Sequence, residues 1–155
     1  MKGTTQTDLL GGEVEKCAFC KIVKGELEAL VVFEDELSVA FLDHNPVFPG
    51  HTLLIPKSHY RLIAELPAPF VGYLFANLQL VSEGVKAGMK SDGTFLAINN
   101  GVSQQVPHLH IHVIPRRHKD GLRGFFWPRA KYPDERTARE VQEAIRSAIG
   151  SLRPR

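Results

Sequence analysis

The sequence has no apolar run of the length needed to cross a membrane, and residues 1–12 lack the apolar segment of a secretory signal peptide. We therefore expect a cytoplasmic protein with no membrane partner. The formal net charge of +2 is small, which argues against a general binder of nucleic acid or other polyanions. Cysteine is also scarce, because Cys17 and Cys20 are the two in the chain. In a reducing compartment such a C-x-x-C pair points to metal or redox chemistry more than to a structural disulfide.

The apolar pattern predicts the architecture. Apolar residues make up 43% of the 155, which predicts one globular domain with a buried core. We expect a knuckle and short helix at 17–25, a long helix at 69–89, a helix after Asp134, and strands at 30–34, 37–42, 51–55, 95–98 and 108–114. The expected fold is α+β, with one long helix packed across a mostly antiparallel five-stranded sheet.

Three segments are expected along the chain. Residues 1–14 are predicted to form a disordered leader, residues 15–117 the main domain, and residues 118–155 a basic aromatic loop and a C-terminal helix packed on the same domain. Six basic side chains and one acidic side chain give residues 116–131 a charge of +5. This charge indicates a local anion site.

Three histidines, His108, His110 and His112, alternate with apolar residues. Successive side chains of a strand point to opposite faces, so the three imidazoles are predicted to share one face, about 6–7 Å apart. A core strand would carry valine or isoleucine at these places. The row could hold a metal, attack a phosphate, or do both at adjacent positions.

The C-x-x-C pair favours zinc. Structural zinc takes four cysteine or histidine ligands in a tetrahedron. Cys17 and Cys20 supply two, and the best candidates for the other two are His108, the first of the row, and His59, which follows a predicted strand end. The competing interpretation is that the cysteine pair is accidental or redox-active.

A zinc site of this composition leaves His110 and His112 for phosphate chemistry. Attack on phosphorus needs an unprotonated imidazole nitrogen, and hydrogen-bond donors around the phosphoryl oxygens. His110 is the candidate nucleophile, and a backbone carbonyl could fix its tautomer by accepting from its other ring nitrogen. His112 is the candidate donor. The polar loop at 99–105 could bring further donors, because Gly101 allows the backbone to approach a ligand closely.

These residues resemble the histidine triad (HIT) superfamily. The signature of this family is three histidines that alternate with apolar residues, with two apolar residues after the third histidine. Residues 108–114 match it in full. Further blocks at 17–23, 40–46 and 50–59 are similar to the family's N-terminal knuckle, its ribose-binding turn and its next strand with a terminal histidine. The resemblance covers residues 15 to 117, and the basic segment after it resembles a bacterial-type branch.

The resemblance implies a hydrolase or transferase that cleaves the α-phosphate linkage of a purine, adenosine-type, nucleotide conjugate. The substrate would be a nucleotide phosphoramidate or a dinucleoside polyphosphate. It implies that His110 forms a nucleotidyl-histidine and that His112 binds the phosphate. It also implies structural zinc at Cys17, Cys20, His59 and His108, and a homodimer formed through the long helix or the sheet edge. The implied nucleotide-binding residues are Phe19, Ile22, Phe41, Asp43 at the ribose, Asn99, Ser103, Gln104, Gln105 and His112.

Two features depart from the family pattern or extend beyond it. Gln105 stands where many members carry a serine or threonine that helps to protonate the leaving group, so the leaving group stays open. We also hypothesise that Arg116, Arg117 and Arg123 hold an anionic leaving group.

Three other functions compete with this interpretation. One is a zinc hydrolase in which the three triad histidines are the metal ligands, which would leave the cysteines without a role. Another is a nucleotide-binding or scaffold protein with little turnover. The least favoured is processing of nucleic-acid ends, which is suggested by the aromatic and basic residues Phe125, Phe126, Trp127 and Arg129.

Overall fold

The computed structural model of the chain describes residues 13–122 and 130–152, and it divides the chain into two compact units, Met1–Asp120 and Gly121–Arg155. The second unit contains the helix α4 (Glu135–Leu152), which begins after Asp134 as expected, because the Asp134 carboxylate accepts the Thr137 N–H at 2.7 Å. That α4 packs on the main domain stays a prediction. Residues 1–12, most of the expected leader, lie outside the described residues, as do Arg123, Phe125, Phe126, Trp127 and Arg129.

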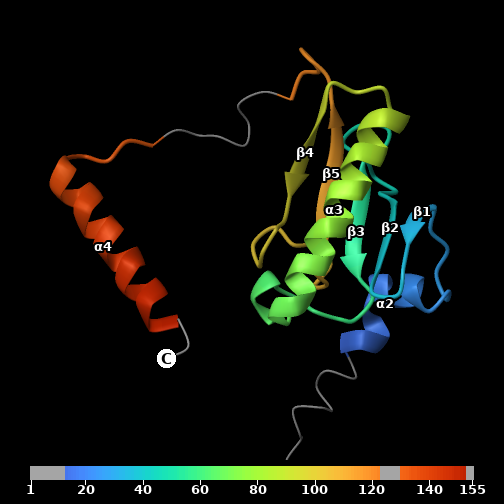
Figure 1. Cartoon of the computed structure of the whole chain (residues 1–155), viewed down its shortest axis with the longest axis horizontal. Helices are drawn as coiled ribbons and strands as arrows, with labels where there is room; N and C mark the ends of the chain where they lie inside the picture. Colours follow the sequence, from blue (N-terminus) through green and yellow to red (C-terminus); the bar gives the residue numbers. More distant parts are fainter. Residues whose placement is uncertain (1–12, 123–129, 153–155) are drawn as a thin grey trace, which may run out of the picture. The chain divides into compact units, whose positions relative to one another are not determined.

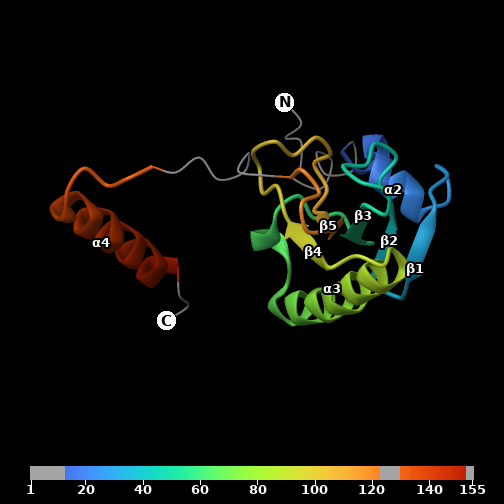
Figure 2. The ribbon, with the colours of Figure 1, turned by 90° about the horizontal axis from the view of Figure 1, so that it is seen from above.

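The first unit is an α+β domain built on a five-stranded antiparallel sheet, as the sequence predicted (Figure 1). The sheet order is β1-β2-β3-β5-β4. The strands are β1 (Val31–Glu34), β2 (Ser38–Leu42), β3 (Thr52–Pro56), β4 (Gly93–Ala97) and β5 (Ile111–Arg116). Figure 2 shows α3 (Ala68–Gly88) along one face of this sheet and α2 (Ala18–Val23) on the opposite side. None of the helices in the described ranges is long and apolar enough to span a membrane.

Helix α3 covers one face of the sheet through a single apolar stripe. Leu74, Leu78 and Val81 recur at steps of four and three, and all three are buried. They pack against the residues of β3 and β5 that point to the same side, such as Leu54 and Ile111. Full burial of each such side chain contributes about 1.5–3 kcal/mol. This packing therefore holds α3 on the sheet.

The opposite face of the sheet is covered by α2. Alternation along the strands sends a second set of apolar side chains to this face. This core cluster contains Cys17, Phe19, Cys20, Val39, Phe41, Leu53 and Ile55. The cysteine pair therefore lies over the face of the sheet that also carries His112, since His112 pairs with Leu53 across β3 and β5.

The histidine row enters its strand later than the sequence pattern predicts. Strand β5 begins at Ile111, so His108 and His110 precede it. The backbone here bonds outside the ladder, because the His108 N–H donates to the Val106 carbonyl at 2.8 Å and the Leu109 N–H donates to the Tyr60 carbonyl at 2.6 Å. The predicted spacing is correspondingly wrong: the rings of His110 and His112 lie 4.9 Å apart, not 6–7 Å.

A hydrogen-bond network around Asp35 joins the β1–β2 turn to α3. The carboxylate of Asp35 accepts from the backbone N–H groups of Leu37 and Ser38 at 3.0 and 2.8 Å. Its other oxygen accepts from Tyr73 at 2.8 Å and Asn77 at 2.6 Å, both on α3. Burial raises the pKa of Asp35, but these hydrogen bonds outweigh it and lower the pKa to about 2.

Candidate active site and metal centre

The candidate active site is built on a row of side chains that crosses four strands. Cross-strand partners share a face of the sheet, and Phe41 pairs with Leu53, Leu53 with His112, and His112 with Ala97. The pairing of β4 with β5 ends at Ala97 and His112, and the polar loop begins two residues after Ala97, at Asn99. The sheet thus brings Phe41, Leu53, His112 and Ala97 to one face.

His110 has one ring nitrogen occupied and one available. Its Nδ1 lies 2.7 Å from the carbonyl oxygen of His108, and the side chain is buried. A carbonyl only accepts, so Nδ1 carries the proton and the lone pair is on Nε2. The Phe19 ring stands edge-on to the imidazole, with centroids 5.2 Å apart, and limits how the imidazole can turn. This tautomer suits Nε2 for nucleophilic attack.

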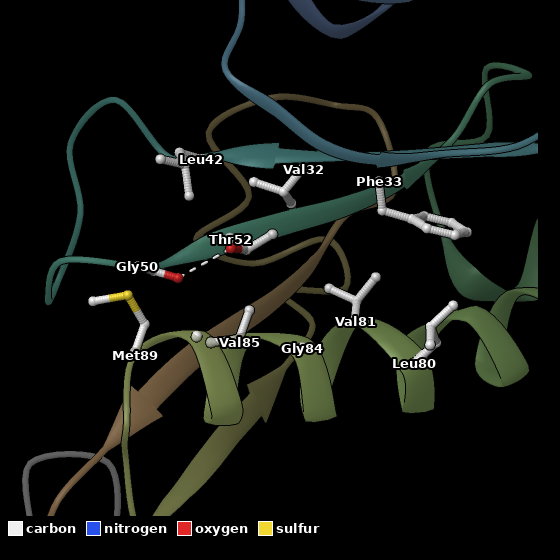
Figure 3. Close-up of a pocket in the computed structure, with 11 residues that line it drawn as sticks. Val32, Phe33, Leu42, Gly50, Thr52, Leu80, Val81, Gly84, Val85 and Met89 are labelled. Carbon is white, nitrogen blue, oxygen red and sulfur yellow. Dashed lines mark hydrogen bonds between the residues drawn. The ribbon is translucent and has the colours of Figure 1, made fainter.

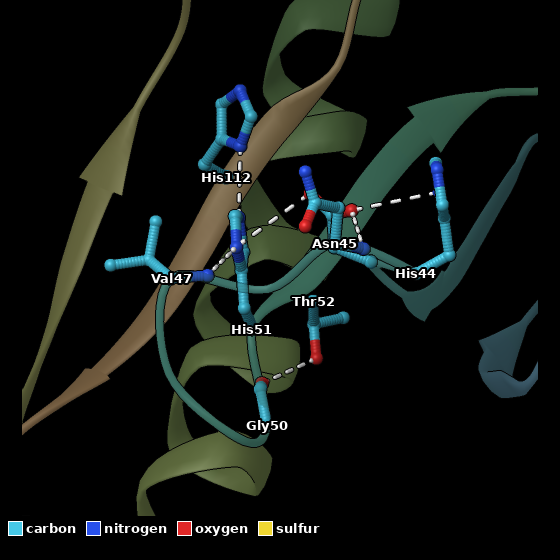
Figure 4. A network of polar contacts seen from close by, with 8 residues as sticks. His44, Asn45, Val47, Gly50, His51, Thr52 and His112 are labelled. Atoms are coloured by element: carbon cyan, nitrogen blue, oxygen red, sulfur yellow. Dashed lines mark hydrogen bonds and ion pairs between the residues drawn. The ribbon is translucent and has the colours of Figure 1, made fainter.

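His112 is oriented by a second histidine, His51 (Figure 4). The Val47 N–H donates to His51 Nδ1 at 3.2 Å, so the proton of neutral His51 is on Nε2. His51 Nε2 lies 2.9 Å from His112 Nδ1 and donates to it. The proton of neutral His112 is therefore on Nε2, which is buried and has no hydrogen-bond partner among the described residues. This N–H is a donor without an acceptor, which suits a phosphoryl oxygen.

Burial keeps both of these histidines neutral. Burial, together with the neighbouring imidazoles of His110 and His51, lowers the pKa of His112 to about 4. Burial also lowers the pKa of His51, although the Asp43 carboxylate 3.6 Å away opposes the shift. At neutral pH His51 and His112 therefore have the neutral tautomers that the hydrogen bond from the Val47 N–H sets.

Asp43 lies at the end of β2, beside this pair. One carboxylate oxygen accepts the Asn45 N–H at 2.9 Å, and the other faces His51. Asp43 is only partly buried, so part of the carboxylate is accessible to a ligand. Its role at the ribose stays a prediction.

Gln104 braces the polar loop. Its side-chain oxygen accepts the Gly101 N–H at 3.1 Å, and its nitrogen donates to the Arg61 carbonyl at 2.8 Å. Gly101 and Ser103 both have positive φ, of 94° and 58°. The side-chain amide of Gln104 is thus engaged within the protein. The backbone of Gln104 is the part of the residue that could bind a nucleotide. Ser103 and Gln105 are exposed, and Asn99 is half-buried.

The three residues expected to wall a base pocket lie together over the sheet. Phe19 and Phe41 are 7% and 3% exposed and meet edge-to-face at 5.5 Å, while Ile22 is partly buried beside them. Two of the three are therefore core side chains with little surface left to contact a base.

The four predicted metal ligands converge. Cys17, Cys20, His59 and His108 each offer a ligand atom within 4.8 Å of the others. Cys20 Sγ lies 3.3 Å from His59 Nδ1 and 3.6 Å from His108 Nδ1, and Cys17 Sγ lies 3.5 Å from His108 Nδ1. Zinc with tetrahedral thiolate and imidazole ligands separates neighbouring ligand atoms by about 3.3–3.8 Å. The donor set and its spacing fit zinc.

Tautomers and protonation support this fit. His108 Nε2 donates to the Pro56 carbonyl at 2.8 Å, which leaves the Nδ1 lone pair facing the sulfurs. Burial lowers the pKa of His108 to about 4 and also lowers the pKa of His59, so both imidazoles are neutral, as ligands must be. Burial and the neighbouring Cys17 raise the pKa of Cys20 to about 12, and a bound cation would reverse this shift.

Two sequence-based hypotheses do not fit the geometry. The triad histidines do not converge on one point, because His108 faces the cysteines, His110 the His108 carbonyl and His112 the His51 ring. They are therefore unsuited to be the three ligands of a catalytic zinc. Of the three proposed leaving-group arginines, Arg123 lies outside the described residues, and the other two are engaged elsewhere: Arg116 forms a two-point contact with Asp120, and Arg117 donates to the Met89 carbonyl.

An apolar pocket lies on the opposite face of the sheet (Figure 3). Its volume is about 500 Å³, and it opens between the β1 side of the sheet and the C-terminal half of α3. Apolar side chains and three glycines line it, and Thr52 supplies a hydroxyl that donates to the Gly50 carbonyl at 3.0 Å. None of the described residues that line this pocket has a titratable side chain, which separates it from the histidine chemistry.

Comparison with known proteins identifies the family. A sequence model of the HIT domain matches residues 24–119. An adenylylsulfatase of Arabidopsis thaliana is 40% identical over 108 residues, which are 68% of this chain and 55% of the relative. The chain thus spans about half the length of that protein. An adenosine 5'-monophosphoramidase of Saccharomyces cerevisiae is 31% identical over 87% of this chain and 84% of its own length.

Solved structures agree. A protein of Streptococcus mutans is 34% identical, with a TM-score of 0.81 over 96% of this chain and 93% of its own. A zinc-bound histidine triad family protein of Mycobacterium smegmatis is also 34% identical, with a TM-score of 0.67 over 89% and 99% of the two chains. This chain belongs to the HIT family, whose characterised relatives here include nucleotide hydrolases.

Proposed function

We propose that this protein cleaves the α-phosphate linkage of an adenosine-type purine nucleotide conjugate through a covalent nucleotidyl-histidine on His110. The tautomer of His110 is the observation that carries this proposal. Its Nδ1–H is committed to the His108 carbonyl at 2.7 Å, and its Nε2 lone pair is left beside the donor His112. A buried imidazole held in this way needs no proton transfer before it attacks.

In the first step, His110 Nε2 attacks the α-phosphorus as the bond to the leaving group breaks. The electron pair of the broken bond goes to the leaving group, which takes up a proton from solvent. The new N–P bond turns the imidazole into a cation, and the His108 carbonyl, which accepts from Nδ1, stabilises this charge. His112 Nε2–H donates to a phosphoryl oxygen as negative charge develops there.

In the second step, the oxygen of water or of another acceptor attacks the phosphorus. The N–P bond breaks, its electron pair returns to His110 Nε2, and the nucleotide leaves with the acceptor attached. The proton lost by the acceptor passes to solvent. In this scheme Asp43 binds the ribose hydroxyls, Phe19, Ile22 and Phe41 border the base, and the backbone at Ser103 to Gln105, with Asn99, borders the phosphate.

The leaving group is proposed to be small or uncharged. The two characterised relatives are named for adenylyl sulfate and for an adenosine phosphoramidate, which share the adenylate and differ in the leaving group. Arg116 and Arg117 are engaged by Asp120 and by a carbonyl, which counts against a dedicated site for a polyphosphate tail. We therefore place adenosine phosphoramidates and adenylyl mixed anhydrides ahead of dinucleoside polyphosphates.

We also propose a structural zinc at Cys17, Cys20, His59 and His108, which would cross-link α2 to the segments after β3 and before β5. A homodimer is proposed through α3 and the edge strand β4. Phe75 and Leu96 are 40% and 43% exposed there, and a hollow between the helix and the strand is lined by both.

A trapping experiment tests the proposed reaction. Zinc-loaded wild type is mixed with an adenosine phosphoramidate, adenylyl sulfate or diadenosine polyphosphate that is radiolabelled at the α-phosphate, and is then quenched in alkali, in which phosphohistidine survives. We expect label on wild type and none on His110→Ala. His118→Ala, which changes an exposed histidine beyond the other end of β5, should label like wild type. Turnover by His110→Ala at the wild-type rate on every substrate would overturn the assignment.

A further inference from the structure

A single peptide unit connects the metal centre to the nucleophile. The peptide between His108 and Leu109 uses both of its polar atoms. Its carbonyl oxygen lies 2.7 Å from His110 Nδ1, and its N–H donates to the Tyr60 carbonyl at 2.6 Å. Its first residue, His108, is one of the four proposed metal ligands, and Tyr60 directly follows His59, which is another. Both histidine ligands thus hold the group that orients His110.

The residues on both sides of this peptide are fixed as well. The His108 side chain is fully buried, and its ring donates to the Pro56 carbonyl at 2.8 Å. The His59 and His108 rings meet edge-on, with centroids 5.0 Å apart. The contacts that join the four ligands to one another are sulfur–nitrogen approaches of 3.3–3.6 Å. Without a metal these are weak hydrogen bonds, so the metal would be the strong connection in this assembly.

We infer that metal bound by Cys17, Cys20, His59 and His108 holds the His108–Leu109 peptide in the orientation that fixes the tautomer of His110. The centre is then a positioning element for the nucleophile and not only a brace for the fold. His108 acts twice, through its ring on the metal and through its carbonyl on His110. This inference rests on the proposed function for its kinetic consequence, whereas its spectroscopic consequence is independent of any reaction.

Three forms of the full-length protein test the inference: zinc-loaded wild type, His59→Ala, and zinc-loaded His59→Cys. His59→Ala removes one ligand, and His59→Cys restores four ligands in a combination that zinc also accepts. Nitrogen-15 NMR of the histidine rings at one fixed pH reports which ring nitrogen of His110 is protonated, and how fast that proton exchanges. The amide of Leu78 in α3 and near-ultraviolet circular dichroism report whether the fold is retained.

Wild type is expected to show one His110 tautomer with a slowly exchanging Nδ1 proton. In His59→Ala the second tautomer should appear, and the Nδ1 proton should exchange about tenfold faster or more, while Leu78 is unchanged. The rate of nucleotidyl-histidine formation should fall by about the same factor, with KM for the nucleotide within about twofold. Zinc-loaded His59→Cys should recover the tautomer and the rate.

A His59→Ala protein that keeps a single tautomer and an unchanged exchange rate would overturn the inference. If His59→Ala does not fold, wild type loaded with zinc is compared with wild type loaded with the larger cadmium ion. The exchange rate of the His110 Nδ1 proton should then differ between the two metals, and equal rates would overturn the inference. Absence of labelled phosphohistidine on zinc-loaded wild type would instead count against the proposed function, and would leave the tautomer result standing.

Discussion

His51 is 3% exposed and bears on the proposed chemistry through its hydrogen bond to His112. His51 Nδ1 accepts a hydrogen bond from the Val47 N–H and its Nε2–H donates one to His112, so it decides which nitrogen of His112 is protonated. Replacing His51 by glutamine leaves His112 free to turn its bare nitrogen toward the phosphate. Loss of such an orienting partner typically costs 10–100-fold in activity.

We therefore predict that His51→Gln lowers kcat by about 10–100-fold with little change in KM for the nucleotide, because the donor acts mainly as charge develops in the transition state. Steady-state kinetics on an adenosine phosphoramidate measure this change. His118→Gln makes the same substitution at an exposed histidine and should behave like wild type. An equal loss of activity in both variants would show that the hydrogen bond from His51 to His112 has no special role.

At the residue scale, the sequence predicted the local part of the candidate site. The four candidate metal ligands converge as expected, and the carbonyl acceptor expected for His110 is that of His108, two residues away. That the four residues bind a metal stays a prediction. His51 was missed, because it meets His112 only through the pairing of β3 with β5, which are far apart in the chain. One available clue was that His51 precedes Leu53 by two and so shares the site face.

A few polar contacts join the helices and strands to one another. The hydrogen bonds that Asp35 accepts between the β1–β2 turn and α3 make the stability of the fold depend on pH. The pKa of Asp35 in the folded protein is about 2, below its unfolded value of about 3.9. The contribution of its charge is therefore complete above about pH 4 and is lost as the pH falls toward 2.

Asp35→Asn should lower the free energy of unfolding at pH 7 by about 1–2 kcal/mol, because five donors, the Ser38 hydroxyl among them, lose a charged acceptor. The difference from wild type should shrink as the pH is lowered from 4 to 2. Urea titrations across this range measure it, with Glu36→Gln in the same turn as the matched control. A difference that is constant with pH, or equally large in the control, would contradict this account.

Gly50 shows how one backbone position couples a loop to a helix. Its φ of +92° is unfavourable for any residue with a side chain, and an added Cβ would come within 2.5 Å of Met89 Cγ at the end of α3. Gly84, inside α3, has ordinary helical backbone with nothing within 4 Å of an added Cβ.

We predict opposite effects for the same substitution at these two glycines. Gly50→Ala should destabilise the fold by about 1–3 kcal/mol, and should reduce activity because His51 is its neighbour. Gly84→Ala should stabilise it by about 0.5–1 kcal/mol. Chemical denaturation of both variants beside wild type is the measurement. Equal signs at both positions would contradict the prediction.

The element boundaries show where sequence patterns stop being sufficient. Helix α3 was predicted within about one residue, because a long amphipathic period carries its own signal. Strand β5 was predicted three residues too early. The alternation at 108–110 does not come from strand pairing, since His108 turns toward the cysteines and the Leu109 N–H donates to the Tyr60 carbonyl. It reflects the needs of the candidate metal centre and the candidate active site. Functional sites are where such local rules are expected to fail.

At the scale of the whole molecule, the proposed homodimer has a defined place. Strand β4 is the last in the sheet order, so one side of it has no partner among the described strands. Phe75 on α3 and Leu96 on β4 expose apolar surface beside it. A stable homodimer needs about 1,200–2,000 Å² of buried surface, and an adjoining helix and strand edge provide a continuous face for it.

Phe75→Asp should therefore produce a monomer, because it places a charge in the centre of this face. Leu80→Asp is the matched control: Leu80 lies on the same helix and is more exposed, at 59%, but it lines the apolar pocket on the other side. Sedimentation equilibrium at micromolar concentration should give twice the chain mass for wild type and Leu80→Asp, and the mass of one chain for Phe75→Asp. A monomeric wild type, or dissociation caused by Leu80→Asp alone, would place the interface elsewhere or remove it.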